Sequence, residues 1–509
     1  MNDLRKRSGR AEDEVRPPLV IVGGGVAGLS AATMLAERGV RVLVLDARPR
    51  LGGRATAFAD RDTGELVDNG QHVMFGCYRA TLAFLKRIGA ESNVQTQPTL
   101  EIPFIDRDGV RTELRCPSWL PAPLHLLGGV VGWRGLPLRD RLSVLRLAPA
   151  LLTRDLKVGP TRVEVQPGST APPPTVGPTF RSGVSEAGRQ AESGGSTSRS
   201  GVNATERGRE VASGDTVLDW LRAHGQSHGL ITALWEPLAV AALNQPIDQA
   251  AAEPFVRVLR EMFSTDKTAA SLVLPRRPLH EMYAEPARAF IERAGGEVRT
   301  GALARVVADD SGVSAVEVRG ERIATTQVIS AVPWHGLRAL FASTPAALAG
   351  TVADASAMAS MPIVTVNLWY DRVVMPDAFV GLTGRTLQWI FDKRRVFGEA
   401  ASHLSLVVSA AEAVTPMGRD ELVAIAVREV ADALPAARGA ALIRATVIRE
   451  KQATFSLSAG QPKRPPALTA IPGFVLAGDW TDTGLPGTIE SAALSGHRAA
   501  LAILNSEYK

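Results

Sequence analysis

The sequence predicts an α/β fold in which a discontinuous, Rossmann-like dinucleotide-binding domain carries a second, α+β domain with a mixed or antiparallel sheet. Three observations predict it. An apolar run at residues 19–22 leads into a glycine-rich turn, a second run ends in an acidic residue, and a third, near the end of the chain, leads into Gly-Asp. Buried parallel strands followed by such turns are typical of α/β sheets that bind ligands at the carboxyl ends of their strands.

The first glycine-rich turn has the spacing of a phosphate-binding loop. Gly23 permits a tight turn, Gly25 lets the backbone approach a pyrophosphate, and Gly28 lets the next helix pack closely on the strand. We expect this helix to continue through residues 29–38 and to stop at Gly39. Its N-terminal N–H groups would then face the phosphates. The alternative is a glycine-rich turn in an α/β domain without a ligand.

An acidic residue follows at the distance that a ribose requires. The second predicted strand, residues 41–45, ends at Asp46. A carboxylate there can accept hydrogen bonds from both ribose hydroxyls of an adenosine. Because it would repel a 2′-phosphate, NADP is disfavoured.

Features elsewhere in the chain favour FAD over NAD. Gly53 and Arg54 belong to a second glycine turn, where a guanidinium fork can bind phosphate oxygens. Gly478 and Asp479 end an apolar strand, and this carboxylate could bind the ribityl hydroxyls of a flavin. The alternatives are a solvated surface arginine for Arg54 and a loop or N-cap aspartate for Asp479.

A helix is predicted to begin near Thr488 and to run to Ala500, with its N-terminus toward the pyrimidine side of the flavin. The predicted cofactor is therefore FAD. The residues predicted to bind it are Gly23, Gly25, Gly28, Asp46, Gly53, Arg54, Gly478, Asp479, Thr488 and Ile489.

These motifs resemble the FAD-dependent amine oxidase and carotenoid desaturase superfamily. Within it, residues 68–78, 234–244 and 478–486 resemble the hydroxysqualene dehydroxylases. Asp46 departs from the superfamily pattern, which more often has glutamate, although the shorter acid should still reach the ribose. The resemblance implies that the backbone of Val306 contacts the adenine. It also implies reductive removal of the hydroxyl from hydroxysqualene, giving squalene for hopanoid synthesis.

Such a reaction needs a proton donor beside the flavin. The predicted candidates are Asp68, His72, Tyr78 and Glu236. Each also has a purely structural interpretation: the first two would order a turn, Tyr78 would pack, and Glu236 would cap a helix. The alternative functions are a carotenoid or phytoene desaturase, a flavin amine oxidase, and a non-catalytic flavoprotein that presents a lipid in a squalene pathway complex.

Composition restricts the class of protein further. Because the 509 residues include only two cysteines, we expect no disulfide framework. Because the histidines are scattered, the sequence indicates no metal site. A net charge of +5 without a nucleic-acid motif predicts no nucleic-acid partner. No apolar run reaches the ~18 residues of a membrane span. We expect a cytoplasmic protein with an isoprenoid lipid substrate and an unidentified electron donor. Residues 117–152 are expected either to contact the inner face of the cell membrane or to form a buried wall.

The sequence also predicts how the domains divide. The FAD-binding domain would comprise residues 17–75, 278–335 and 465–509, and the substrate domain residues 76–277 and 336–464. Residues 1–16 are expected to be a disordered tail. Gly, Pro, Ser and Thr make up more than half of residues 158–214, which predicts a disordered insertion in the substrate domain.

Overall fold

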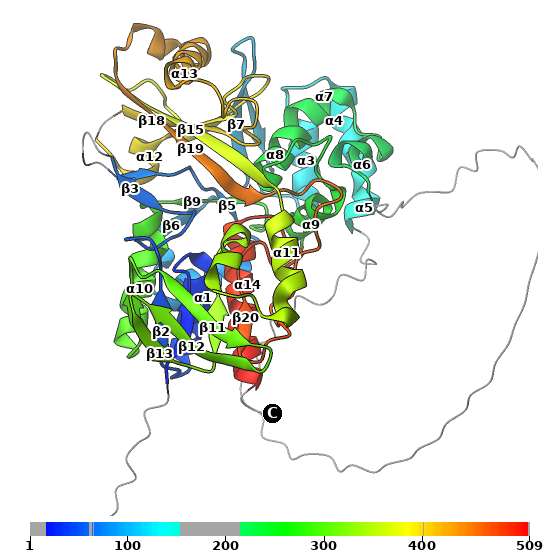
Figure 1. The fold of residues 1–509 in the computed structure, drawn as a ribbon. Helices are drawn as coiled ribbons and strands as arrows, with labels where there is room; N and C mark the ends of the chain where they lie inside the picture. Colours follow the sequence, from blue (N-terminus) through cyan, green and yellow to red (C-terminus); the bar gives the residue numbers. More distant parts are fainter. Residues whose placement is uncertain (1–16, 61–63, 65, 153–213, 401, 507–509) are drawn as a thin grey trace, which may run out of the picture.

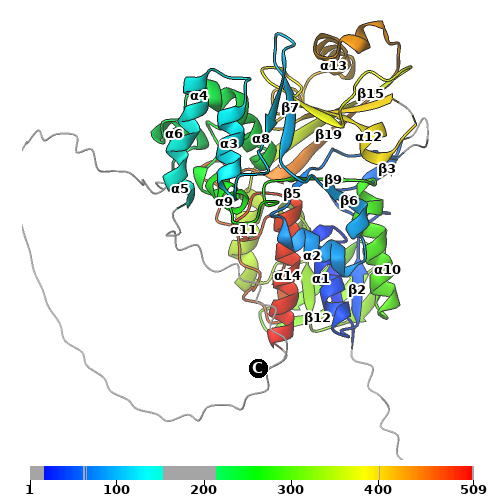
Figure 2. The same ribbon diagram turned by 180° about the vertical axis from the view of Figure 1, so that it is seen from behind.

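The computed structural model describes residues 17–60, 64, 66–152, 214–400 and 402–506. The predicted tail, 1–16, and the predicted insertion up to residue 213 lie outside the described residues. Figure 1 shows two lobes, one around a parallel sheet and one around a larger mixed sheet, with a cluster of helices beside the second. Figure 2 shows the same arrangement from behind, with α14 running along the first lobe.

A five-stranded parallel sheet forms the centre of the first lobe. Its order is β10 (Glu297–Arg299), β2 (Val42–Leu45), β1 (Leu19–Val22), β14 (Val328–Ser330) and β20 (Phe474–Leu476). Every residue of β1 and β2 is buried, as expected for a strand covered on both faces. The strands come from three separate parts of the chain, although the domain boundaries stay predictions.

The side chains of these strands alternate between two cores. Leu19, Ile21, Val42 and Val44 pack with the helices α1 (Val26–Glu37), α10 (Glu285–Arg293) and α14 (Ile489–Ser506). Their neighbours in sequence face the antiparallel sheet of β11 (Ala304–Asp309), β12 (Gly312–Val318) and β13 (Glu321–Ala324). This period of two is that of a strand buried on both faces.

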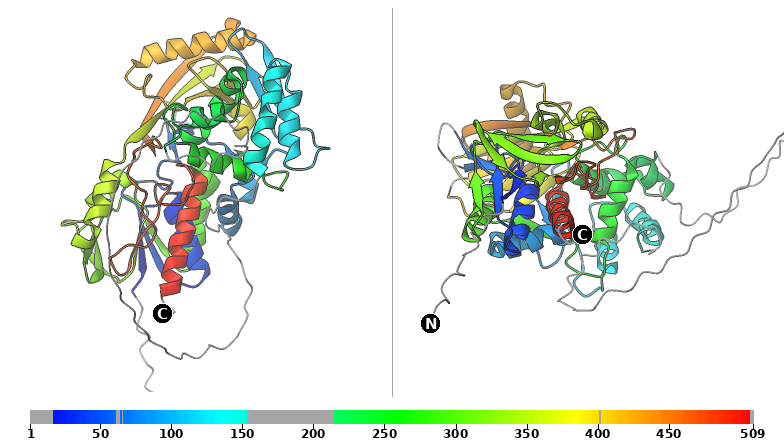
Figure 3. Two further views of the ribbon diagram at one scale, coloured as in Figure 1. Left: turned by 90° about the vertical axis from the view of Figure 1, so that its right-hand side faces the viewer. Right: turned by 60° about the horizontal axis from the view of Figure 1, so that its bottom comes forward.

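Helix α1 begins at Val26, because Gly25 is extended and serves as its N-cap, and it ends at Glu37, one residue before the predicted end. Close packing explains Gly28: a Cβ atom there would lie 1.9 Å from the carbonyl oxygen of Gly23. Across the lobe, a Cβ atom on Gly496 of α14 would lie 2.1 Å from the carbonyl oxygen of Ala27. These two glycines let α1 lie against both the phosphate-binding turn and α14. The right-hand view of Figure 3 shows α14, in red, beside α1, in blue.

The second lobe contains a seven-stranded mixed sheet, which confirms the predicted fold class. All neighbouring strands are antiparallel except β16 and β7, which are parallel. Helix α13 (Arg419–Ala433) packs on one face. The order is β19 (Leu442–Phe455), β15 (Ser360–Tyr370), β18 (Ser402–Val408), β17 (Trp389–Asp392), β16 (Phe379–Leu382), β7 (Glu101–Ile105) and β8 (Arg111–Arg115).

Smaller elements connect the lobes. The short strands are β3 (Ala57–Ala59), β4 (Leu66–Asp68), β5 (Met74–Phe75), β6 (Val94–Thr96) and β9 (Leu272–Pro275). The other helices of the connections are α2 (Arg79–Arg87), α11 (Ala349–Ala357) and α12 (Lys393–Phe397). The helical cluster contains α3 (Leu124–Gly132), α4 (Leu138–Leu142), α5 (Ala148–Leu152), α6 (Val217–Ala223), α7 (His228–Leu230), α8 (Glu236–Leu243) and α9 (Ala252–Met262). Among the described helices, none combines the length and apolar character needed to cross a bilayer.

Candidate functional site

A cavity of about 480 Å³ lies at the carboxyl ends of the parallel strands. Its walls include Val22 at the end of β1, Leu45 at the end of β2 and Ala331 after β14. The loop after β20 and the start of α14 close another side, and residues of the mixed sheet complete it. This is where open α/β sheets bind their ligands.

The two predicted glycine turns meet in this cavity. Gly23, Gly25 and Gly53 all line it, and a Cβ atom on Gly25 would lie 3.8 Å from the Cα atom of Gly53. Helix α1 begins here without a side-chain cap and without an acidic residue in its first turn. Its leading N–H groups therefore lack side-chain partners and suit an anionic group such as a pyrophosphate.

Asp46 lines the adjacent part of the cavity. Its carboxylate accepts hydrogen bonds from the backbone N–H of Gly24 at 2.7 Å and of Arg48 at 2.8 Å. Each carboxylate oxygen has a second lone pair. The residue can therefore be held by the turn and still accept the hydroxyls of a ribose, as predicted.

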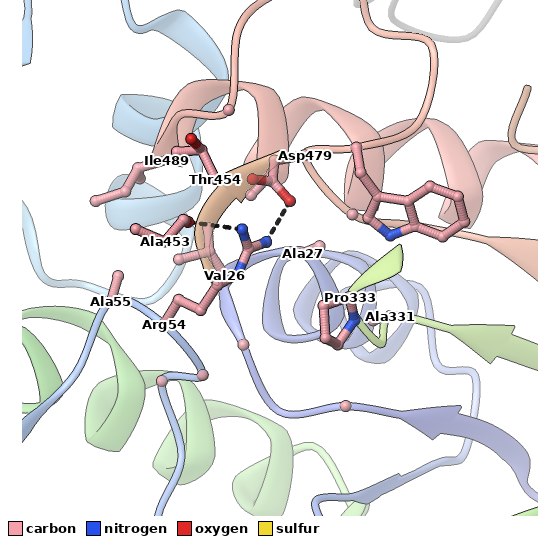
Figure 4. A pocket seen from close by; sticks show the side chains of 18 of the residues that line it. Val26, Ala27, Arg54, Ala55, Ala331, Pro333, Ala453, Thr454, Asp479 and Ile489 are labelled. Carbon is pink, nitrogen blue, oxygen red and sulfur yellow. Dashed lines mark hydrogen bonds and ion pairs between the residues drawn. The ribbon is translucent and has the colours of Figure 1, made fainter. Parts of the chain in front are cut away.

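Arg54 and Asp479 pair directly across the cavity, although they lie at opposite ends of the chain (Figure 4). A second N–H of the guanidinium donates to the carbonyl oxygen of Ala453 at 2.9 Å. The guanidinium carbon also lies 5.0 Å from the centre of the Trp334 ring. Both residues are thus present in one site, but the sequence did not indicate that they bind each other.

The start of α14 forms the far wall. Thr488 and Ile489 line the cavity, and so does Gly478, in the loop that precedes them. The next residue, Glu490, is buried and accepts hydrogen bonds from the N–H groups of Ala80 and Thr81, both at 2.8 Å. It also accepts the Thr81 hydroxyl at 2.7 Å. Glu490 therefore caps α2 from a helix four hundred residues away, a contact that only the fold reveals.

Two predicted cofactor-binding residues do not line the cavity. Gly28 packs against the phosphate-binding turn, so closely that a Cβ atom would not fit there. Val306 is buried inside β11, and residues 302–304, just before it, form the wall instead. The predicted contact between the Val306 backbone and adenine stays a prediction.

The structure brings two of the four candidate proton donors into the cavity, His72 and Tyr78. Asp68 lies behind the wall and forms a buried ion pair with Lys393, at 3.1 Å. Glu236 is exposed at the start of α8 and does not line the cavity. The sequence had no signal for Lys393, which lies in α12, 325 residues from Asp68.

Burial determines the protonation of the two donors in the cavity. It lowers the pKa of the His72 imidazole and raises the pKa of the Tyr78 phenol. Both side chains are therefore neutral at pH 7. Tyr78 keeps its proton, whereas His72 can take one up only below the usual range of histidine.

Other polar residues of the cavity were missed from the sequence. Glu450 of β19 and Ser409 line its side next to the mixed sheet. Asn244 ends α8 with φ +51° and donates to the Met361 carbonyl oxygen and the Thr454 hydroxyl, at 3.2 and 3.0 Å. It also accepts the N–H of Ala410, at 2.7 Å. Asn244 therefore fixes the helical cluster to the sheet beside the cavity.

Comparisons with known proteins agree with this geometry. The hydroxysqualene dehydroxylase of Sinorhizobium fredii is 26% identical over 491 residues, covering 94% of this chain and 96% of its own. The zeta-carotene desaturase of Arabidopsis thaliana is 22% identical, covering 95% and 84%. An oxidoreductase of Methanosarcina mazei has the same fold, with a TM-score of 0.65, 14% identity and coverage of 96% and 99%.

The family described as "Flavin containing amine oxidoreductase" matches residues 26–504, nearly the whole chain. The matched range includes most of the cavity lining described above. A flavin cofactor fits the uncapped helix, the carboxylate of Asp46 in the cavity wall and the second glycine turn. The chain belongs to the flavin containing amine oxidoreductase family, and its cofactor is FAD.

Proposed function

We propose that this protein removes the hydroxyl group of hydroxysqualene reductively and produces squalene. The observation that carries the proposal is the match to the hydroxysqualene dehydroxylase of Sinorhizobium fredii, which extends over 94% of this chain. The cavity supports it, because part of its wall beyond the glycine turns is apolar. Ala241 and Ala242 of α8, Leu340, Ile363 and Val407 line this part.

The overall reaction breaks one C–O bond and forms one C–H bond. Two electrons and two protons enter, and the hydroxyl leaves as water. Bound FAD supplies the two-electron chemistry. The electrons must come from an external reductant, because the substrate itself is reduced.

The chain itself must supply a proton to the departing hydroxyl. Of the four predicted donors, we favour Tyr78, because it lines the cavity and burial keeps its phenol protonated. Neutral His72 is better suited to accept a hydrogen bond than to donate a proton. Asp68 is engaged by Lys393, and Glu236 points to solvent, so neither is well placed.

The test is product analysis under anaerobic conditions with a chemical reductant. Hydroxysqualene and phytoene are offered side by side to the FAD-loaded protein. Squalene formation from the alcohol supports the proposal. Unchanged hydroxysqualene with fully flavinated protein contradicts it, and desaturation of phytoene would favour the carotenoid alternative. No turnover of either substrate would favour the lipid-presenting alternative.

We further propose that the protein works at the inner face of the cell membrane. Residues 138–147 form one helical segment with two opposite faces. Val144 and Leu147 are buried, whereas Leu138, Leu142 and Leu145 are about half exposed on the other side. The spacing i, i+4 and i+7 places these leucines on one stripe.

Other exposed residues of the same region extend the stripe. Trp119 is 79% exposed, Leu124 is exposed at the start of α3, and α3 packs against α4 (Figure 2). Exposed arginines stand nearby at Arg134, Arg139 and Arg146. The deeper part of residues 117–152 is buried, as in the alternative of a buried wall, and the exposed face is the part that we propose as the membrane contact.

Apolar side chains flanked by arginines suit an anionic lipid surface. We expect the protein to co-sediment with vesicles that contain phosphatidylglycerol. Replacing Leu138, Leu142 and Leu145 by serine should reduce the bound fraction, whereas Val373→Ser, an exposed apolar control, should not. Equal binding of the triple variant would contradict this docking surface.

A further inference from the structure

The loop of residues 69–73, here called the cavity loop, lies between β4 and β5 and lines the cavity along its whole length. Two adjacent side chains of this loop, Gln71 and His72, are polar and line the cavity. The partners behind the loop determine which atoms they present to a ligand.

Lys393 determines the orientation of Gln71. The ammonium group lies 2.5 Å from the Gln71 oxygen atom Oε1 and is 1% exposed. An ammonium group can only donate, so the atom that faces it must be the amide oxygen. The amide nitrogen Nε2 is then directed away from Lys393. One of its N–H groups donates to the His72 carbonyl oxygen at 3.2 Å, and the other remains for the cavity.

The backbone determines the tautomer of His72 in the same way. Its Nδ1 lies 2.9 Å from the carbonyl oxygen of Gly70, which can only accept. Nδ1 must therefore carry the proton, and the neutral ring leaves the lone pair of Nε2 as an acceptor. Within the described part of the chain, Nε2 has no hydrogen-bond partner in the fold.

The cavity loop therefore presents one donor and one acceptor from neighbouring residues. A hydroxyl group has the complementary pair, since its oxygen accepts and its hydrogen donates. We propose that Gln71 and His72 form a binding site for the hydroxyl group of the isoprenoid substrate, with the amide of Gln71 donating to it and Nε2 of His72 accepting from it. This inference rests on the proposed function, which it deepens by assigning the atoms that recognise the alcohol.

Lys393 acts on this site as a positioning residue. Its ammonium donates to both Gln71 and Asp68, and Asp68 in turn accepts the N–H of Leu279 at 3.0 Å. The Phe397 ring lies 4.3 Å from the Lys393 nitrogen. The ion pair joins β4, directly before the cavity loop, to α12, which directly follows β17 of the mixed sheet. The cavity loop is thus fixed from behind, and the Gln71 amide cannot turn over.

The site explains how an alcohol is preferred over a hydrocarbon of the same length. A ligand without a hydroxyl would leave the Gln71 N–H and the His72 lone pair unpaired in a buried place, which costs binding free energy. Squalene, which lacks the hydroxyl, should therefore bind more weakly than hydroxysqualene and leave after it forms.

The experiment measures binding rather than turnover. Hydroxysqualene and squalene are titrated separately into the oxidised, FAD-loaded protein, and the change in flavin absorbance reports binding. We expect hydroxysqualene to bind roughly ten-fold more tightly, as one or two neutral hydrogen bonds would give. Gln71→Met and His72→Leu should each remove most of this preference by weakening hydroxysqualene alone. Gln95→Met, on the exposed strand β6, is the control and should change nothing.

A double variant tests the positioning role. Asp68→Asn combined with Lys393→Met removes both charges together, so neither is left buried alone. The preference should fall as in Gln71→Met, with an unchanged flavin spectrum. A preserved preference would show that Lys393 does not orient the loop.

The other outcomes overturn the inference in distinguishable ways. If Gln71→Met and His72→Leu weaken FAD binding or shift the flavin spectrum while the preference persists, the two side chains face the cofactor instead. If the wild-type protein shows no preference, there is no hydroxyl site. If the preference is present and lost in the variants but no squalene is ever formed, the hydroxyl site stands and the proposed reaction is wrong.

Discussion

Glu490 offers the sharpest test of how the cavity is held together. Helix α2 begins at Arg79 with no side-chain cap from its own N-cap residue, Tyr78. Glu490 of α14 replaces that cap by accepting three hydrogen bonds, from the N–H groups of Ala80 and Thr81 and from the Thr81 hydroxyl. Because Tyr78 lines the cavity immediately before α2, the same contact holds this predicted proton donor in place.

The magnitude follows from the donors that Glu490→Ala would leave behind. Loss of a helix cap costs about 1 kcal/mol, and each buried donor left without a partner costs about 1–3 kcal/mol. Three donors, partly relaxed or hydrated, give a loss of roughly 3–5 kcal/mol in the free energy of unfolding. Glu490→Gln retains one acceptor oxygen but directs an NH₂ group at a donor, so we expect about half of that loss.

The assay is thermal unfolding of the FAD-loaded protein, followed by tryptophan and released flavin fluorescence. At about 2 °C per kcal/mol for a large domain, Glu490→Ala should lower Tm by roughly 6–10 °C. Glu292→Gln replaces an exposed glutamate of α10 and should stay within about 0.5 kcal/mol of the wild type. If Glu490→Ala is as stable as this control, the cap between α14 and α2 is not what stabilises this wall.

Three further perturbations test other parts of the site. Gly496→Ala places a Cβ atom 2.1 Å from the Ala27 carbonyl oxygen and should lower the free energy of unfolding in urea by about 1–3 kcal/mol. The control is Gly350→Ala, at a helical glycine with open space around it, which should be neutral or slightly stabilising. Equal effects of the two substitutions would refute the close packing. Arg54→Lys keeps the charge but loses the planar fork, so FAD should dissociate roughly ten-fold more readily in a fluorescence titration; unchanged affinity would remove Arg54 from the cofactor site. Burial lowers the pKa of His72, which faces Asp68 and Lys393. The affinity for hydroxysqualene should therefore be constant near pH 7 and fall only below about pH 6.5, because protonation removes the Nε2 acceptor. A loss of affinity that begins above pH 7 would contradict a neutral, buried imidazole.

Much of the nucleotide-binding lobe could be predicted from the sequence because its determinants are local. The strand, glycine turn and helix of residues 19–38 follow one another directly, and each glycine of the turn has a steric reason that can be read from its position. The same holds for the strand before Asp479 and the helix after Thr488. The start of α1 is also determined locally, since Gly25 is its N-cap.

The contacts that complete the site could not be predicted because they join distant parts of the chain. Arg54 and Asp479 were both assigned to the cofactor, yet nothing in either segment indicates that they pair. Lys393 and Glu490 sit in segments without a recognisable pattern for their roles, and their partners lie more than three hundred residues away. Glu236 belongs to a motif that resembles the dehydroxylases, but motif membership does not tell which face of α8 it occupies.

The charges of the cavity explain why the glycine turn should contribute more than the arginines to binding the pyrophosphate of FAD. Its charged side chains are two arginines and three carboxylates: Arg48, Arg54, Asp46, Glu450 and Asp479. With one more acid than base, and with Arg54 already paired to Asp479, net side-chain charge does not attract the pyrophosphate of FAD. The attraction must come from the uncapped N-terminus of α1, whose N–H groups have no side-chain partner and whose first turn holds no acidic residue. This origin requires Gly25 and Gly28 to bring backbone, rather than side chains, next to the phosphates, and it predicts that FAD affinity depends only weakly on ionic strength. A steep loss of FAD between 50 and 500 mM NaCl would show that the arginines dominate instead.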